Sequence, residues 1–158
     1  MGPDLAKVIQ ELSSRMRHLK ATQEDKVSAG NLTERDLMIL GLLNENGKMA
    51  VSQISAADPA ASESTISTTI TKLWRNKKMV TKTISPENQR TTIVELTDKG
   101  KKAIEVYNKQ RDERFKTLFD AIDVTEPEKE VMTKVLSRAI TFFDKHLGVA
   151  AMASNTAN

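Results

Sequence analysis

The chain has 158 residues, of which 39% are hydrophobic and 28% are charged, enough for one ordinary folded domain with a buried core. It contains no cysteine, which excludes disulfides, thiol redox switches and thiolate metal sites. Its apolar runs are only a few residues long, too short to cross a bilayer, so we expect a cytoplasmic protein.

Positive charge is concentrated in one segment of the chain. Residues 62–102 contain nine Lys or Arg and four Asp or Glu, which gives +5, whereas the rest of the chain carries −2. A local excess of cations is what a phosphate-binding surface requires, because DNA binding draws much of its free energy from counterion release. A solvated surface could have the same composition, so charge alone leaves both interpretations open.

An amphipathic helix is predicted at the start of the chain. Apolar residues recur from Leu5 to Leu19 at the i, i+3, i+4 and i+7 spacing of one helical stripe. The pattern predicts a helix over about residues 4–27, with one face available for packing.

Two further helices are predicted before the cationic segment. Thr33 and Asp36 are spaced as a capping box, so the first of these helices should span about residues 33–45 and end in a left-handed cap at Gly47. A short helix over residues 51–57 should follow, because Asp58-Pro59 breaks the pattern after it.

The next predicted helix has an unusual polar face. It begins at the N-cap Ser62 and runs to about Asn76, with Ile66, Ile70 and Leu73 on its apolar side. The other side is almost entirely hydroxyl, amide or cationic: Ser62, Ser64, Thr65, Ser67, Thr68, Thr69, Thr71, Lys72, Arg75 and Asn76. Ser and Thr add little helix stability, because their hydroxyls compete for backbone groups. Such a face suits a DNA major groove, and a merely Thr-rich surface helix is the alternative.

A β-hairpin with a polar tip is predicted after this helix. Residues 79–85 and 91–96 are rich in β-branched side chains, and the segment between them is polar and ends at Arg90. Two helices joined by a tight turn and followed by a basic hairpin form a winged helix-turn-helix. We therefore expect residues 31–100 to form a DNA-binding domain, with the helix after Ser62 as its recognition helix.

Two long helices are predicted in the last third of the chain. Thr97 is the expected N-cap of the first, which should contain about 24 residues. Thr125 and Glu128 form the expected capping box of the second, which should end at Gly148. The predicted fold class is therefore mainly α with a small β-hairpin.

The terminal helices carry apolar stripes that are too extensive for so small a winged domain to cover alone. Exposed stripes of this size normally mark an interface. We therefore assign residues 1–30 and 101–148 to dimerisation. Residues 149–158 are small and polar, and we expect them to form a disordered tail.

Three stretches of the sequence resemble the MarR family of bacterial transcriptional regulators, and the likeness extends over roughly residues 5–147. Leu32-Thr33-Glu34-Arg35-Asp36-Leu37 is similar to the opening of the family's second helix. Ser64-Thr65-Ile66-Ser67 followed by Lys72-Leu73 resembles its recognition helix. The most specific likeness, to the family's wing, is Asn88-Gln89-Arg90 with Val94-Glu95-Leu96-Thr97-Asp98-Lys99-Gly100.

The sequence departs from the family pattern at two places. Asn88 stands where the family usually has Asp, so Arg90 should be held by a weaker hydrogen bond. The family's Gly after the recognition helix is missing, and Lys77-Lys78 occupies that region. The turn into the wing should therefore differ in detail.

The resemblance implies a homodimer that places two recognition helices in successive major grooves of a near-palindromic operator, with Arg90 in a minor groove. It also implies a repressor that responds to a small phenolic or lipophilic effector bound between the dimerisation and DNA-binding parts. The candidate residues that line this effector pocket are Met16, Leu19, Met38, Leu42 and Phe115, although the same residues would fit a hydrophobic core equally well.

The residues that we expect to contact DNA are Ser62, Ser64, Thr65, Thr68, Thr69, Lys72, Arg75, Lys82 and Arg90.

Other functions find less support in the sequence. No nucleophile–base pair, Gly-rich phosphate loop or metal-ligand spacing is recognisable, so we expect neither an enzyme nor a cofactor. His18 and His146 could share a metal, but solvated histidines are favoured because no third ligand is evident.

Trp74 shares the apolar side of its helix, and aromatics are only 4% of the chain, which favours duplex over single-strand binding. The alternative function is a protein-interaction or structural module that does not bind DNA.

Overall fold

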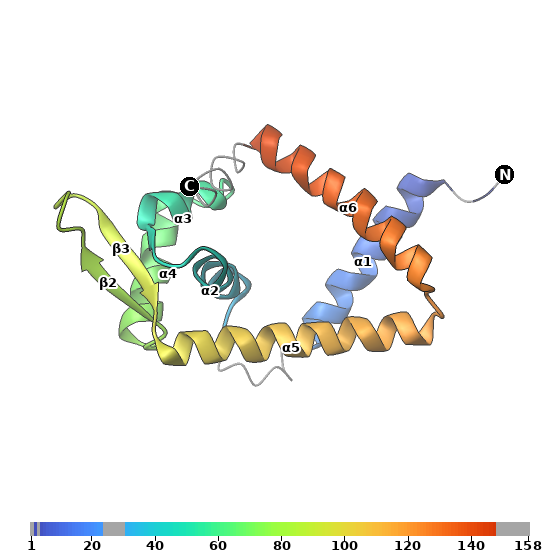
Figure 1. Cartoon of the computed structure of the whole chain (residues 1–158), viewed down its shortest axis with the longest axis horizontal. Helices are drawn as coiled ribbons and strands as arrows, with labels where there is room; N and C mark the ends of the chain where they lie inside the picture. Colours follow the sequence, from blue (N-terminus) through green and yellow to red (C-terminus); the bar gives the residue numbers. More distant parts are fainter. Residues whose placement is uncertain (1, 3, 24–30, 148–158) are drawn as a thin grey trace. The chain divides into compact units, whose positions relative to one another are not determined.

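A computed structural model describes residues 2, 4–23 and 31–147 of the chain (Figure 1). It comprises two compact units, residues 1–32 and residues 33–158, and each is described by itself. The predicted end of the first helix, the predicted stop at Gly148 and the predicted tail at 149–158 lie outside the described residues.

The helix α1, Leu5–Gln23, belongs to the first unit. It confirms the amphipathic helix predicted there. The apolar side chains of its stripe are 43–72% exposed: Leu5, Val8, Ile9, Leu12, Met16 and Leu19.

The second unit is mainly helical with a small antiparallel sheet. Its elements are α2 (Glu34–Asn46), β1 (Met49–Ala50), α3 (Val51–Ala57), α4 (Glu63–Arg75), β2 (Val80–Ile84), β3 (Thr92–Leu96), α5 (Asp98–Ala121) and α6 (Glu126–Leu147). The order of strands in the sheet is β1-β3-β2, with Met49 opposite Val94 and Lys82 also opposite Val94. The predicted fold class is confirmed, and β1 is an addition that the sequence pattern did not indicate.

The core of this unit joins α2, α3, α4, the sheet and the start of α5. The largest side chains that solvent does not reach are Ile39, Leu40, Ile54, Ile66, Ile70, Leu73, Val80, Val94 and Ile104. The apolar side of α4 thus packs inward, against α2, α3 and β2, and its polar side is left at the surface.

Local capping chemistry begins each of the main helices where the sequence indicated. Thr33 Oγ1 accepts a hydrogen bond from the Asp36 N–H, and the Asp36 carboxylate accepts one from the Thr33 N–H. The capping box of Thr125 and Glu128 at the start of α6 is also confirmed. At Gly47 the predicted positive φ is present, at 74°, but ψ is −157°, so the residue is not in the left-handed helical conformation that we expected.

Thr97 and Gly100 join the hairpin to α5. Thr97 Oγ1 donates to the Lys78 carbonyl oxygen at 2.7 Å and accepts from the Gly100 N–H at 3.1 Å. A Cβ atom at Gly100 would lie 2.0 Å from the Met79 carbonyl oxygen, closer than any real contact. This close approach explains why the L-T-x-x-G stretch ends in glycine here.

The turn after α4 contains the departure noted at Lys77-Lys78. Lys78 has a φ of 58°, and the Met79 N–H donates to the Leu73 carbonyl oxygen at 2.9 Å across the helix end. A glycine adopts this conformation at lower cost than a residue with a Cβ atom. Lys78 therefore occupies the left-handed position that a glycine after the helix would occupy.

Candidate nucleic-acid interface

The recognition helix predicted from the sequence is α4. Ser62 is its N-cap, since Ser62 Oγ accepts from the Thr65 N–H at 3.1 Å and lies 2.8 Å from Thr65 Oγ1. Most of its predicted contact residues are exposed, namely Ser62, Ser64, Thr65, Thr68, Lys72 and Arg75, whereas Thr69 is half-buried. The helix therefore presents one continuous polar face to solvent.

An ion pair fixes the far end of this helix. Asp36 is 3% exposed, and besides capping α2 its carboxylate accepts a hydrogen bond from Lys77 Nζ. Arg35 pairs with Asp58 at 3.1 Å, which ties α2 to the end of α3. Lys77 follows the last residue of α4 by two positions, so its pair with Asp36 ties the end of α4 to α2. Sequence reasoning missed both, since neither spacing, 41 nor 23 residues, is a local signal.

The hairpin of β2 and β3 lies next to α4 (Figure 1). Arg90 belongs to the segment between the two strands, at the tip of the hairpin. The Asn88 side-chain oxygen accepts a hydrogen bond from the backbone N–H of Arg90 at 3.1 Å, and the Asn88 carbonyl accepts from the Thr91 N–H. Asn88 thus orders the backbone of the tip. The Arg90 guanidinium makes no hydrogen bond or ion pair to any residue that the structure describes, so its five donors face solvent.

Trp74 brings the helix and the hairpin together. Its ring is half-buried, as expected for a residue on the apolar flank of α4. The Arg75 guanidinium lies 5.1 Å from the ring centroid and Lys82 Nζ lies 5.3 Å from it, both within cation–π range. Lys82 Nζ also donates to Thr71 Oγ1 at 3.3 Å. Two of the residues predicted to contact DNA, Arg75 and Lys82, are therefore held beside one aromatic side chain.

A cleft of about 240 Å³ lies between α4, the hairpin and the junction of β1 with α3. Its lining is mostly polar and includes both hairpin cations: Ala50, Val51, Ser52, Glu63, Ser67, Ile70, Lys82, Arg90, Thr91 and Thr92. The Glu63 carboxylate is the one acidic group in this lining. The structure therefore brings the helix face and two cations of the hairpin to one surface.

The predicted effector-pocket residues are divided between the two units. In the first unit, Met16 and Leu19 are 45% and 54% exposed. In the second unit, Phe115 is 38% exposed, and Met38 and Leu42 are half-buried. None of these five side chains is fully buried.

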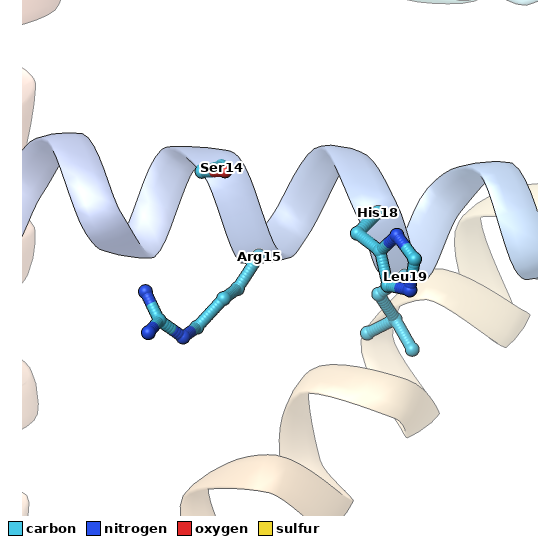
Figure 2. A pocket seen from close by; sticks show the side chains of 4 residues that line it. All are labelled: Ser14, Arg15, His18 and Leu19. Atoms are coloured by element: carbon cyan, nitrogen blue, oxygen red, sulfur yellow. The ribbon is translucent and has the colours of Figure 1, made fainter.

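A shallow depression along α1 is lined by Ser14, Arg15, His18 and Leu19. Figure 2 shows these four side chains, all of which come from the one helix. Four residues of a single helix cannot enclose a ligand, so we assign no site here. Among the described residues, no three His, Asp or Glu side chains gather as metal ligands would. Within the same residues, no helix has the length and apolar character needed to span a membrane.

Solved structures share this architecture at low sequence identity. The DNA complex of FabT from Streptococcus pneumoniae has a TM-score of 0.73 at 18% identity, over 90% of this chain and 99% of that chain. A MarR protein from Peptoclostridium difficile has a TM-score of 0.74 at 19% identity, over 95% of each chain. BpsR from Bordetella bronchiseptica, described for the regulation of its DNA binding by 6-hydroxynicotinic acid, has a TM-score of 0.63 at 18% identity, over 84% of this chain and 98% of that chain.

No protein-family model matches the sequence, and no curated protein matches it. The likeness to these structures is therefore one of fold.

Proposed function

The chain has the winged-helix fold of MarR regulators, and from this premise we propose that it is a sequence-specific duplex-DNA-binding transcriptional regulator rather than an enzyme. The observation that carries the proposal is the exposed face of α4, where hydroxyls and cations lie opposite the buried Ile66, Ile70 and Leu73. An α-helix fits the major groove of B-DNA, and short polar side chains there reach base edges.

The charge distribution supports a DNA partner. The net charge of +5 over residues 62–102 lies on α4, the hairpin and the start of α5. Arg90 extends from the hairpin tip without a partner among the described residues, so a planar guanidinium is available to a narrow minor groove. Lys82 and Arg75, beside Trp74, suit contacts to the phosphate backbone.

A homodimer is the second part of the proposal. The exposed apolar stripes of α1 and α6 need a cover, and a second copy of the chain supplies matching stripes under two-fold symmetry. Two recognition helices related by that symmetry would read a near-palindromic operator with half-sites about 10 bp apart. Repression follows if the bound dimer blocks transcription, and the protein would work in the cytoplasm, beside the chromosome.

An effector site is the third part. BpsR is described with an aromatic acid that regulates its DNA binding. By analogy we propose that Met16, Leu19, Met38, Leu42 and Phe115 line a pocket for a small phenolic or lipophilic molecule in the dimer. A ligand that binds one arrangement of the two recognition helices more tightly would shift the protein toward that arrangement.

The test is a fluorescence-anisotropy titration with duplexes selected from a random-sequence library. Arg90→Ala should weaken binding by about 1–3 kcal/mol while the circular dichroism spectrum is unchanged, because the side chain has no structural contact. Replacing Thr68 and Thr69 together by Glu should abolish binding, since carboxylates would face phosphates and base acceptors. Full affinity in the double variant would show that α4 is not the recognition helix.

The alternative, an interaction or structural module, predicts the opposite pattern. The wild-type protein would select no duplex, and Arg90→Ala would be silent in every assay. Its dimerisation would remain, because the terminal helices are distinct from the hairpin tip.

A further inference from the structure

Two threonines of α4, Thr68 and Thr69, donate their hydroxyl protons within the helix. Thr68 Oγ1 donates to the Ser64 carbonyl oxygen at 2.9 Å, and Thr69 Oγ1 donates to the Thr65 carbonyl oxygen at the same distance. Helical Ser and Thr commonly make this bond to the residue four positions earlier, and Thr117 makes it to Glu113 in α5. The arrangement is thus ordinary helix chemistry, placed here on a recognition surface.

This bond decides what each threonine can offer to DNA. A hydroxyl has one proton to donate and two lone pairs that accept. With the proton committed within the helix, Thr68 keeps only acceptor capacity and its γ-methyl group. Phosphate oxygens accept hydrogen bonds and need a donor, so they are poor partners for it.

Thr68 is the better placed of the two side chains. It is two residues from each of the buried Ile66 and Ile70, and at 100° per residue it therefore points away from the core. It is exposed, whereas Thr69 is half-buried on the flank. Thr68 therefore lies at the centre of the surface that would enter a major groove.

The base pairs differ in what they offer to such a side chain. In the major groove an A·T pair carries both the thymine 5-methyl group and the adenine N6 amino donor. A G·C pair has the cytosine amino donor but no methyl group, and its guanine edge has only acceptors. A side chain with a methyl group and an acceptor therefore matches A·T and mismatches guanine.

We propose that Thr68 is a specificity-determining residue that reads an A·T pair in each half-site, packing its methyl group on thymine and accepting from adenine N6. This inference rests on the proposed function, since it assigns a base to the recognition helix. It leaves guanine and phosphate contacts to the side chains with free donors, Lys72 and Arg75 among them.

The test removes one methyl group from the DNA side or from the protein side of the contact. In a selected duplex, each thymine of the two half-sites is changed in symmetric pairs to uracil, which removes only the 5-methyl group. At one pair of positions, the change to uracil should lower wild-type affinity about sixteenfold. Each half-site loses one buried methyl contact, which is worth about fourfold. Thr68→Ser, which keeps the hydroxyl and removes the methyl group, should lose the same about sixteenfold on the unmodified duplex.

The two changes should not add. On the uracil duplex Thr68→Ser should bind as tightly as the wild-type protein does, because the contact is already lost. Replacing the A·T pair by G·C should weaken wild-type binding, and 5-methylcytosine at that pair should restore part of the loss. The matched control is Thr117→Ser, which removes a methyl group beside the same type of hydrogen bond in α5, outside the recognition helix. Once light scattering shows that this variant assembles as the wild-type protein does, it should lose the same affinity as the wild-type protein when thymine is changed to uracil.

Three outcomes distinguish the claims. Coupling between Thr68→Ser and one pair of uracil positions supports the inference. The inference is overturned if the wild-type protein binds tightly but Thr68→Ser lowers affinity by the same factor on the thymine and uracil duplexes. The proposed function is intact in that case. Failure of the wild-type protein to bind any duplex overturns both.

Discussion

The helices α4 and α6 carry similar apolar stripes but opposite burial. In α4, Ile66, Ile70 and Leu73 are 0% exposed, whereas in α6 Val131, Leu136 and Ile140 are 60–61% exposed. The difference lies in what the rest of the unit supplies, because α4 packs against α2, α3 and β2. The core of the winged part is therefore formed by residues of a single chain. The exposed stripe of α6 lowers the solubility of the protein unless a partner covers it.

The comparison predicts that Ile70→Ala lowers the free energy of unfolding by about 4 kcal/mol, because the lost side chain leaves a cavity. Urea denaturation followed by circular dichroism measures the change, and the loss should be the same at every protein concentration. Leu136→Ala is the control in the other region. Its cost should fall toward zero on dilution, since it acts through contact with a second copy. Equal, concentration-independent losses would contradict the distinction.

A charge in the exposed stripe of α6 should break the proposed dimer. Leu136→Asp places a carboxylate in the proposed interface, and static light scattering should then report a monomer. Affinity for a two-half-site duplex should fall about a hundredfold, because each recognition helix then binds alone. Ser137→Asp is the matched control, one residue along the helix and on its polar side, and it should stay dimeric. A Leu136→Asp protein that remains a dimer would remove α6 from the interface.

The smallest effect concerns the turn between α4 and the hairpin, which together form the proposed DNA-binding surface. Lys78→Gly should raise the free energy of unfolding by about 1 kcal/mol, because glycine adopts the positive φ of 58° without strain. Lys78→Ala keeps the Cβ atom and should give no such gain. If thermal denaturation shows equal stability for both variants, the backbone at Lys78 is not strained.

Local chemistry made much of the fold predictable. Ser62, Thr97 and the capping box at Thr33 mark helix starts by side-chain bonds that span three residues, so the sequence contains the whole signal. The family resemblance, drawn from the wing and helix stretches, is confirmed at the level of fold.

The features that were missed depend on distant partners. The strand β1 is two residues long and exists because Met49 and Ala50 pair with β3, more than 40 positions away. Likewise, the Asp36–Lys77 pair and the contact of Lys82 with Trp74 arise only when α4 docks. The candidate contact residues were identifiable by type and spacing. The use of the Thr68 proton within the helix was not, because a sequence does not specify a rotamer.

The most direct test of the account is the salt dependence of duplex binding, measured by anisotropy together with the stoichiometry of the complex. We predict two copies of the chain per duplex and a linear fall of log K with log salt, with a slope of about −0.9 for each phosphate neutralised. Arg90→Ala should reduce the affinity of that complex. A salt-independent signal, or saturation with one copy per duplex, would contradict the proposal of a dimeric DNA-binding regulator.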